Sequence, residues 1–293
     1  MTHRIVLIGL ALLGLGPRAA SVADSTRVSV APPSPQPGDV VLLQVTGAPP
    51  DARVEWDGRA LALFPTPGGL AALVGIDLDV RPGRIRWRVV PARAAKDGAT
   101  LAAGVVRVQS RTFPTQALTL PKGMVDLDAA TIARVESERQ ELKAALAAGA
   151  AERLWRGPFR IPVEGGRPTG GFGLRRILNG QPRGPHSGYD WGAPAGTPVV
   201  AANAGRAALV GEHFFAGHNV VVDHGLGLFT LYYHLSEARV TPGEPVAAGQ
   251  VIGTVGATGR VTGPHLHFAV LLDGARVDPE SLLGLSPPEE QAP

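Results

Sequence analysis

The chain has 293 residues, which is long enough for two ordinary domains, and 44% of them are hydrophobic, as is typical of a globular protein. Its formal net charge is only +3 and it has no dense run of lysine and arginine, which argues against a nucleic-acid-binding protein. It contains no cysteine, which excludes disulfides, cysteine nucleophiles and cysteine metal ligands.

Residues 1–23 have the layout of a secretory signal peptide. His3 and Arg4 precede an apolar run of about a dozen residues, and Ser21-Val22-Ala23 supplies the small residues of a cleavage site. A membrane-spanning helix needs about 20 apolar residues, and no other segment is long enough, so we expect no transmembrane segment once the signal peptide is removed. The sequence therefore predicts an exported protein of the periplasm or the extracellular side of a cell envelope.

Residues 24–110 read as short strands separated by turns. In the stretch 84–90, Ile85, Trp87 and Val89 alternate with arginines, which predicts a strand with one buried and one wet face. Several such strands in under 90 residues favour a small β-sandwich of immunoglobulin-like type. It has no histidine and no catalytic pattern, so we expect an accessory domain.

Residues 111–157 predict a linker that contains a helix. Asp128 is a suitable N-cap for a helix from Ala129 to Ala148, and Gly149 is a suitable stop. Four apolar residues fall on one stripe of this helix: Ile132, Val135, Leu142 and Leu146. We expect the stripe to dock on one of the domains.

Residues 158–285 predict a mostly antiparallel β domain, because short apolar runs bounded by Gly, Pro or Asn recur without a long helical period. The stretch 286–293, rich in proline and glutamate, predicts a disordered tail. The predicted fold class is therefore mainly β, with an N-terminal sandwich, a connecting helix and a C-terminal antiparallel domain.

Two histidines open one of the predicted strands of this domain. His265 and His267 are separated by one residue, so on a strand their side chains project to the same face. Such a pair suits a metal ligand beside a proton-transfer group, although a pair of half-buried or surface histidines would give the same pattern.

Three further residues complete a candidate constellation. His186 and Asp190 lie on a predicted loop that runs into a strand and returns Asp190 toward His186, and His234 ends another strand. Catalytic zinc sites use three protein nitrogen or oxygen ligands and keep a fourth position for water, and further histidines can handle protons. Four histidines and one aspartate satisfy that need without showing which of them bind metal. We expect structural roles for His213, His218 and His224.

Three segments resemble the signature segments of the LytM/lysostaphin-type zinc peptidases, the M23 family. They are Gly184-Pro185-His186-Ser187-Gly188-Tyr189-Asp190, Tyr233-His234-Leu235-Ser236 and Thr262-Gly263-Pro264-His265-Leu266-His267-Phe268. The resemblance covers roughly residues 158–283 with its elements in family order. The region before it is similar to the immunoglobulin-like N-terminal domain of some bacterial members.

The resemblance implies a role for each residue of the constellation. It makes His186, Asp190 and His267 the ligands of one zinc ion, and His234 and His265 the catalytic histidines. It implies a zinc metalloendopeptidase that uses a metal-activated water to hydrolyse peptide bonds in the stem peptides or cross-links of bacterial peptidoglycan, and we expect a monomer. The alternative is a non-catalytic envelope module that binds cell wall or activates an amidase. The complete five-residue set favours the enzyme.

Overall fold

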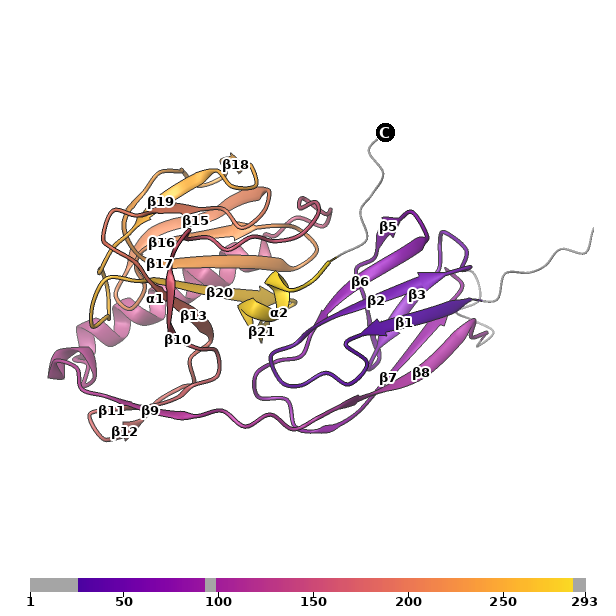
Figure 1. Cartoon of the computed structure of the whole chain (residues 1–293), viewed down its shortest axis with the longest axis horizontal. Helices are drawn as coiled ribbons and strands as arrows, with labels where there is room; N and C mark the ends of the chain where they lie inside the picture. Colours follow the sequence, from indigo (N-terminus) through magenta and orange to yellow (C-terminus); the bar gives the residue numbers. More distant parts are fainter. Residues whose placement is uncertain (1–25, 93–98, 287–293) are drawn as a thin grey trace, which may run out of the picture.

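The structure is a computed structural model and describes residues 26–92 and 99–286. The predicted signal peptide and residues 287–293 of the predicted tail lie outside the described residues. Strands dominate the described chain, as the sequence predicts, and one long helix connects its two parts (Figure 1). Among the described residues, no helix has both the length and the apolar character needed to cross a membrane.

The N-terminal part consists of two antiparallel sheets, which we call the sandwich. Its strands are β1 (Arg27–Ala31), β2 (Val40–Thr46), β3 (Arg53–Trp56), β4 (Arg59–Ala60), β5 (Phe64–Thr66), β6 (Gly69–Gly75), β7 (Gly83–Val90) and β8 (Ala102–Val108). One sheet has the order β1-β2-β6-β5 and the other β4-β3-β7-β8. Apolar residues from both sheets form the shared core, such as Leu43 and Val74 of the first sheet and Trp56 and Val106 of the second.

Strand β7 shows why the alternating pattern folds in this way. Val89 is buried and Ile85 and Trp87 are partly buried against the sandwich core, while the arginines between them are exposed. Burying the apolar face stabilises the sheet, and the arginines keep the other face in water. The two packed sheets agree with the predicted sandwich; its immunoglobulin-like relationship stays a prediction.

The connecting segment contains the predicted helix, α1 (Ala129–Ala147). Asp128 caps it by accepting a 2.7 Å hydrogen bond from the backbone nitrogen of Thr131. Leu142 and Leu146 pack against a small apolar cluster of the C-terminal part, whereas Ile132 is 55% exposed. The predicted stripe therefore docks at its C-terminal end only.

The rest of the segment 111–157 is more than a linker. Strand β9 (Thr115–Leu118) pairs in parallel with β11 (Arg175–Leu178), and the 3-10 helix η2 (Lys122–Met124) follows it. Trp155 is 1% exposed and packs edge-on against Phe64 of the sandwich, with ring centroids 5.3 Å apart. The segment is therefore built into both parts of the molecule.

The C-terminal part is built on one large sheet. Its elements are β10 (Arg167–Gly170), β11, β12 (Gln181–Pro182), β13 (Gly188–Gly192), β14 (Pro198–Val200), β15 (Gly205–His213), β16 (Gly217–Asp223), β17 (Leu228–Ala238), β18 (Pro245–Val246), β19 (Val251–Val255), β20 (Leu266–Leu272), β21 (Ala275–Val277) and α2 (Pro279–Leu283). The main path of the sheet is β10-β13-β20-β17-β16-β15-β18, and every neighbouring pair along it is antiparallel. The neighbours β13, β20 and β17 carry the candidate site.

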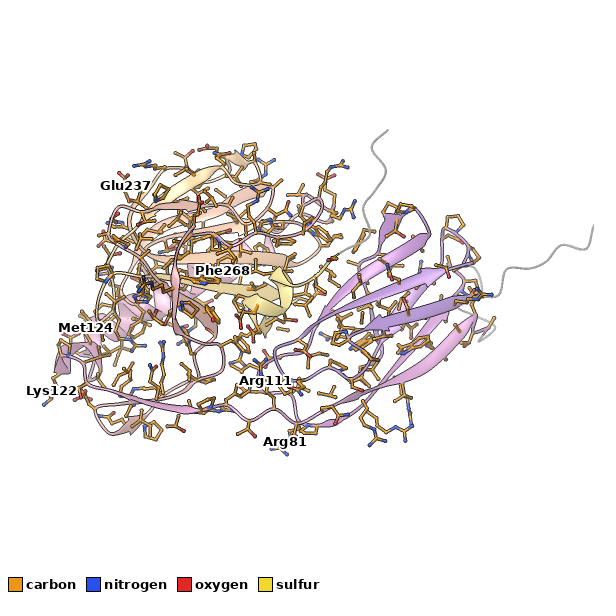
Figure 2. All side chains as sticks on the ribbon, in the orientation of Figure 1. Arg81, Arg111, Lys122, Met124, Glu237 and Phe268 are labelled. Carbon is orange, nitrogen blue, oxygen red and sulfur yellow. The ribbon has the colours of Figure 1, made fainter. Side chains whose placement is uncertain are left out.

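Two arginines tie the sandwich to the C-terminal part. Arg276 of β21 bonds the carboxylates of Asp77 and Asp79, at 2.7 Å and 2.8 Å from its Nη2. Arg111, which lies where the two parts meet (Figure 2), donates a 2.7 Å hydrogen bond to Asp278 at the start of α2. The pairs join residues that are more than 160 positions apart, so they fix how the two parts sit.

Candidate metal centre and active site

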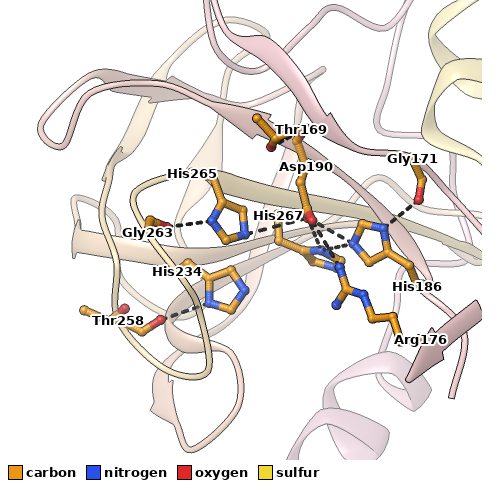
Figure 3. Close-up of polar contacts among 10 residues, drawn as sticks. All are labelled: Thr169, Gly171, Arg176, His186, Asp190, His234, Thr258, Gly263, His265 and His267. Carbon is orange, nitrogen blue, oxygen red and sulfur yellow. Dashed lines mark hydrogen bonds and ion pairs between the residues drawn. The ribbon is translucent and has the colours of Figure 1, made fainter. Parts of the chain in front are cut away.

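Three buried side chains meet at the pairing of β13 with β20. Asp190 lies directly opposite His267 in the register of these strands, and His186 precedes β13 by two residues. Asp190 Oδ1 is 3.0 Å from His186 Nε2 and 2.8 Å from His267 Nδ1, and the two nitrogens are 2.9 Å apart (Figure 3). Loop geometry thus returns His186 to Asp190, as the sequence predicts.

The surroundings of the trio decide which atoms carry lone pairs. His186 Nδ1 is 2.7 Å from the carbonyl oxygen of Gly171, which can only accept, so the hydrogen of the neutral ring sits on Nδ1. Its Nε2 lone pair therefore faces the Asp190 carboxylate. Both the nitrogen and the carboxylate oxygen are electron-pair donors, so a cation between them would stabilise this arrangement. Two imidazole nitrogens and one carboxylate oxygen fit a divalent transition metal such as zinc, and the His186–Gly171 hydrogen bond is the usual support of a histidine ligand.

Electrostatic interactions favour the protonation states in which Asp190 and His267 can bind a metal ion. Burial alone would raise the pKa of Asp190, but its close contacts with His186 and His267 outweigh burial and hold that pKa well below its ordinary value. Arg176 Nη2 adds an ion pair at 3.2 Å from Asp190 Oδ2. Burial lowers the pKa of His267, which favours the neutral imidazole that binds metals.

Two more histidines stand beside the trio. His265 Nδ1 donates to the carbonyl oxygen of Gly263 at 2.8 Å, and His234 Nδ1 donates to that of Thr258 at 2.9 Å. In each neutral ring the lone pair is therefore on Nε2. The rings are 4.9 Å apart between centroids, and His265 Nε2 is 3.8 Å from Asp190 Oδ1.

His234 is held in an unusual backbone conformation. Its φ is 64°, in the left-handed region that residues with a side chain rarely adopt, and its backbone nitrogen donates to Ala216 at 2.7 Å. Such strain persists where surrounding contacts fix it, which is common at functional sites. Burial, with the neighbouring His267 and His265, lowers the pKa of His234 to about 3, so its ring is neutral at ordinary pH.

All five predicted site residues thus lie together, and the structure adds two that the sequence analysis missed. Arg176 pairs with Asp190, and Tyr233 stacks on His267 with ring centroids 5.5 Å apart and an angle of 18°. The position of Tyr233 on a strand, next to His234, could have predicted that it lies beside the site. Nothing in the local sequence distinguishes Arg176 from the arginine before it.

Two of the other histidines, His224 and His213, make contacts of the structural kind that we expected, and the structural role of His218 stays a prediction. His224, which is fully buried, bonds Ala204 through Nδ1 and Thr230 through Nε2, both at 2.7 Å. Burial lowers its pKa to about 4. His213 bonds Glu141 of α1 at 3.1 Å.

Comparisons with known proteins agree on the family. The model described as Peptidase family M23 matches residues 184–279, a stretch that contains all five site residues. A solved structure of a Pseudomonas aeruginosa protein described as a candidate M23 peptidase is 32% identical, with a TM-score of 0.65, over 86% of this chain and 96% of the other.

Curated relatives match over less than half of the chain. The peptidoglycan DD-endopeptidase ShyA of Vibrio cholerae is 40% identical over 43% of this chain and 30% of its own length. The DD-carboxypeptidase/endopeptidase Mpg of Neisseria meningitidis is 43% identical over 36% of this chain and 25% of its own length. The chain thus spans less than a third of each of these relatives. From the whole-length likeness to the Pseudomonas protein, together with the family match over the site, the chain belongs to peptidase family M23.

Proposed function

We propose that the protein is a zinc-dependent endopeptidase that hydrolyses peptide bonds in bacterial peptidoglycan. The observation that carries the proposal is the meeting of His186, Asp190 and His267 beside two further histidines, each of which donates from Nδ1 to a backbone carbonyl. The name of the relative ShyA, a peptidoglycan DD-endopeptidase, supports the substrate class, and the name of Mpg, a DD-carboxypeptidase/endopeptidase, supports peptidase activity.

Zinc is the metal that this donor set favours. Two imidazole nitrogens and one carboxylate oxygen are typical of catalytic zinc sites, whereas magnesium and calcium prefer oxygen ligands alone. When bound, zinc supplies Lewis-acid chemistry, since it polarises a carbonyl oxygen and lowers the pKa of water to about 7. His186, Asp190 and His267 would hold the ion.

The two remaining histidines have different roles, proton transfer for His265 and orientation of the attacking water for His234. We assign the general base to His265, because a proton taken up at its Nε2 faces the Asp190 carboxylate 3.8 Å away. That proton comes from the attacking water and passes to the leaving amine nitrogen as the carbon–nitrogen bond breaks. His234, which stays neutral, accepts a hydrogen bond at Nε2 and orients the water.

The predicted setting is consistent with this substrate. Peptidoglycan lies outside the cytoplasm, and the predicted signal peptide of residues 1–23 would export the protein to the periplasm or beyond. We propose that it acts at the cell envelope as a monomer.

Digestion of purified cross-linked peptidoglycan by the full chain tests the proposal. We expect new muropeptides with zinc, none with a chelator, and recovery when zinc is added back. The His265→Ala variant is the matched control, because it removes the base and leaves the three ligands in place. Unchanged muropeptides with zinc supplied would contradict the enzyme and favour the alternative, a non-catalytic wall-binding or amidase-activating module.

A further inference from the structure

Three arginines lie close to one another, and one of them, Arg176, pairs with Asp190 of the trio. Arg176 and Arg183 lie opposite each other on the hairpin of β11 and β12, where the backbone nitrogen of Arg183 donates to the carbonyl of Arg176 at 2.9 Å. Arg260 belongs to the loop between β19 and β20, two residues after Thr258, which bonds His234. Burial lowers the pKa of Arg260, and the positive charges of Arg176 and Arg183 lower it further, so the three charges interact.

Two of the three charges have no carboxylate partner among the described residues. Asp190 pairs with Arg176, but within residues 26–92 and 99–286 no carboxylate lies within 4.0 Å of Arg183 or Arg260. The Nε of Arg176 is buried without an acceptor. Like charges directly opposite on paired strands are destabilising, so the fold alone does not account for the cluster.

Two of the guanidinium groups donate to neutral backbone carbonyls. Arg260 donates to the carbonyl of Met124 at 3.5 Å and Arg183 to that of Val125 at 3.3 Å. Both contacts are longer than the 2.7–2.9 Å of a typical bond from a guanidinium to a carboxylate. Asp126, which follows Val125, uses Oδ1 to accept from Gln181.

The arginines are nevertheless held in place. The guanidinium of Arg260 lies over the ring of Phe215, 4.0 Å from its centroid. Arg183 donates to the side chain of Gln181 and to the carbonyl of Pro182. A rigid, positively charged site of this kind suits a carboxylate, which accepts two parallel hydrogen bonds from an arginine.

We propose that Arg176, Arg183 and Arg260 form a carboxylate-binding subsite that selects peptide substrates with a free carboxylate close to the scissile bond. The proposal rests on the proposed function and deepens it, since it names the class of peptide. The substrate carboxylate would replace the carbonyl oxygens of Met124 and Val125 on the two outer arginines.

Calorimetric binding of two peptides to the zinc-loaded His265→Ala protein tests the subsite. One is a cross-linked peptide of the peptidoglycan type with free carboxylates, and the other is the same peptide with those groups as primary amides. We expect the free acid to bind at least about tenfold more tightly, because a charged hydrogen bond contributes about that factor. Adding Arg183→Gln and Arg260→Gln should bring the two affinities to within about twofold.

The matched control is Arg239→Gln in the same His265→Ala protein. Arg239 is exposed and pairs with Glu237, which lies at the top of the C-terminal part in Figure 2, well away from the label of Met124. The Arg239→Gln variant should keep the full preference for the peptide with free carboxylates. Zinc content and circular dichroism check that the variants fold.

Two results would overturn the subsite: a free acid that binds no better than the amide, or a preference that survives the double substitution. Cleavage by the wild-type chain is scored separately with the same two peptides. Equal cleavage of both would remove the subsite and leave the peptidase, whereas preferential binding without any cleavage would keep the subsite and remove the peptidase.

Discussion

Replacing Arg276 with alanine should loosen the sandwich from the C-terminal part. The Arg276 side chain bonds both carboxylate oxygens of Asp77, at 3.0 Å from Nε and 2.7 Å from Nη2, and reaches Asp79 as well. The substitution removes these bonds and leaves two acids side by side. The backbone contacts of Arg276 with Asp77 and Leu78 remain, so the sheet itself should persist.

The exposure of the pair sets the size of the effect. The Arg276 and Asp77 side chains are 32% and 27% exposed, between a surface ion pair, which contributes up to about 1 kcal/mol, and a buried one, whose breaking costs about 3–5 kcal/mol. We therefore expect the free energy of unfolding to fall by about 2 kcal/mol at pH 7. Arg239→Ala, which breaks a pair that is more than half exposed, is the control and should cost under about 1 kcal/mol.

The loss should depend on pH. Burial raises the pKa of Asp77, but its hydrogen bonds from Arg276 outweigh burial and hold the pKa below the ordinary value. The stabilisation is therefore complete above the unfolded-state pKa of about 3.9 and disappears as the pH falls through the folded-state value. The difference between wild type and variant should shrink below about pH 4.

Urea unfolding followed by tryptophan fluorescence measures the effect, because Trp155 lies against Phe64 where the two parts meet. A loss for Arg276→Ala no larger than that of the control, or one that is the same at pH 7 and at pH 3, would refute the reasoning.

Two further substitutions test the site and the junction. His234→Ala should keep zinc and lower kcat about 10²-fold, because the water that His234 orients would be misplaced, and loss of zinc in this variant would contradict its place outside the ligand set. Trp155→Ala should cost about 3–5 kcal/mol in urea unfolding, because the side chain is 1% exposed. Ile161→Ala, at 56% exposed, should cost far less, and equal losses would show that Trp155 is not a core residue of the junction.

The sequence predicted the local parts of the site well. His265 and His267 share a face because strand side chains alternate, and the structure turns both rings toward Asp190. His186 and Asp190 are close because the loop before β13 folds back, although four extended residues could span about 13 Å. The helix N-cap at Asp128 could also be predicted from the sequence, because it joins residues only three positions apart.

What escaped prediction depends on contacts between distant segments. The parallel pairing of β9 with β11 joins residues about 60 positions apart, and no local pattern specifies that register. Arg176 meets Asp190 only after β11 and β12 have folded into a hairpin. Ile132 fits the helical period but is exposed, because the apolar cluster on which α1 docks is reached only by residues near its C-terminal end, among them Leu142 and Leu146.

Zinc content of three purified proteins tests the central claim most directly. The wild-type chain should hold one zinc ion, His267→Ala should lose it, and His265→Ala should keep it while losing turnover, because Nδ1 of His267 faces Asp190 at 2.8 Å whereas Nε2 of His265 stays 3.8 Å away. Full zinc in His267→Ala, or loss of zinc in His265→Ala, would contradict the division of the five residues into ligands and catalytic histidines.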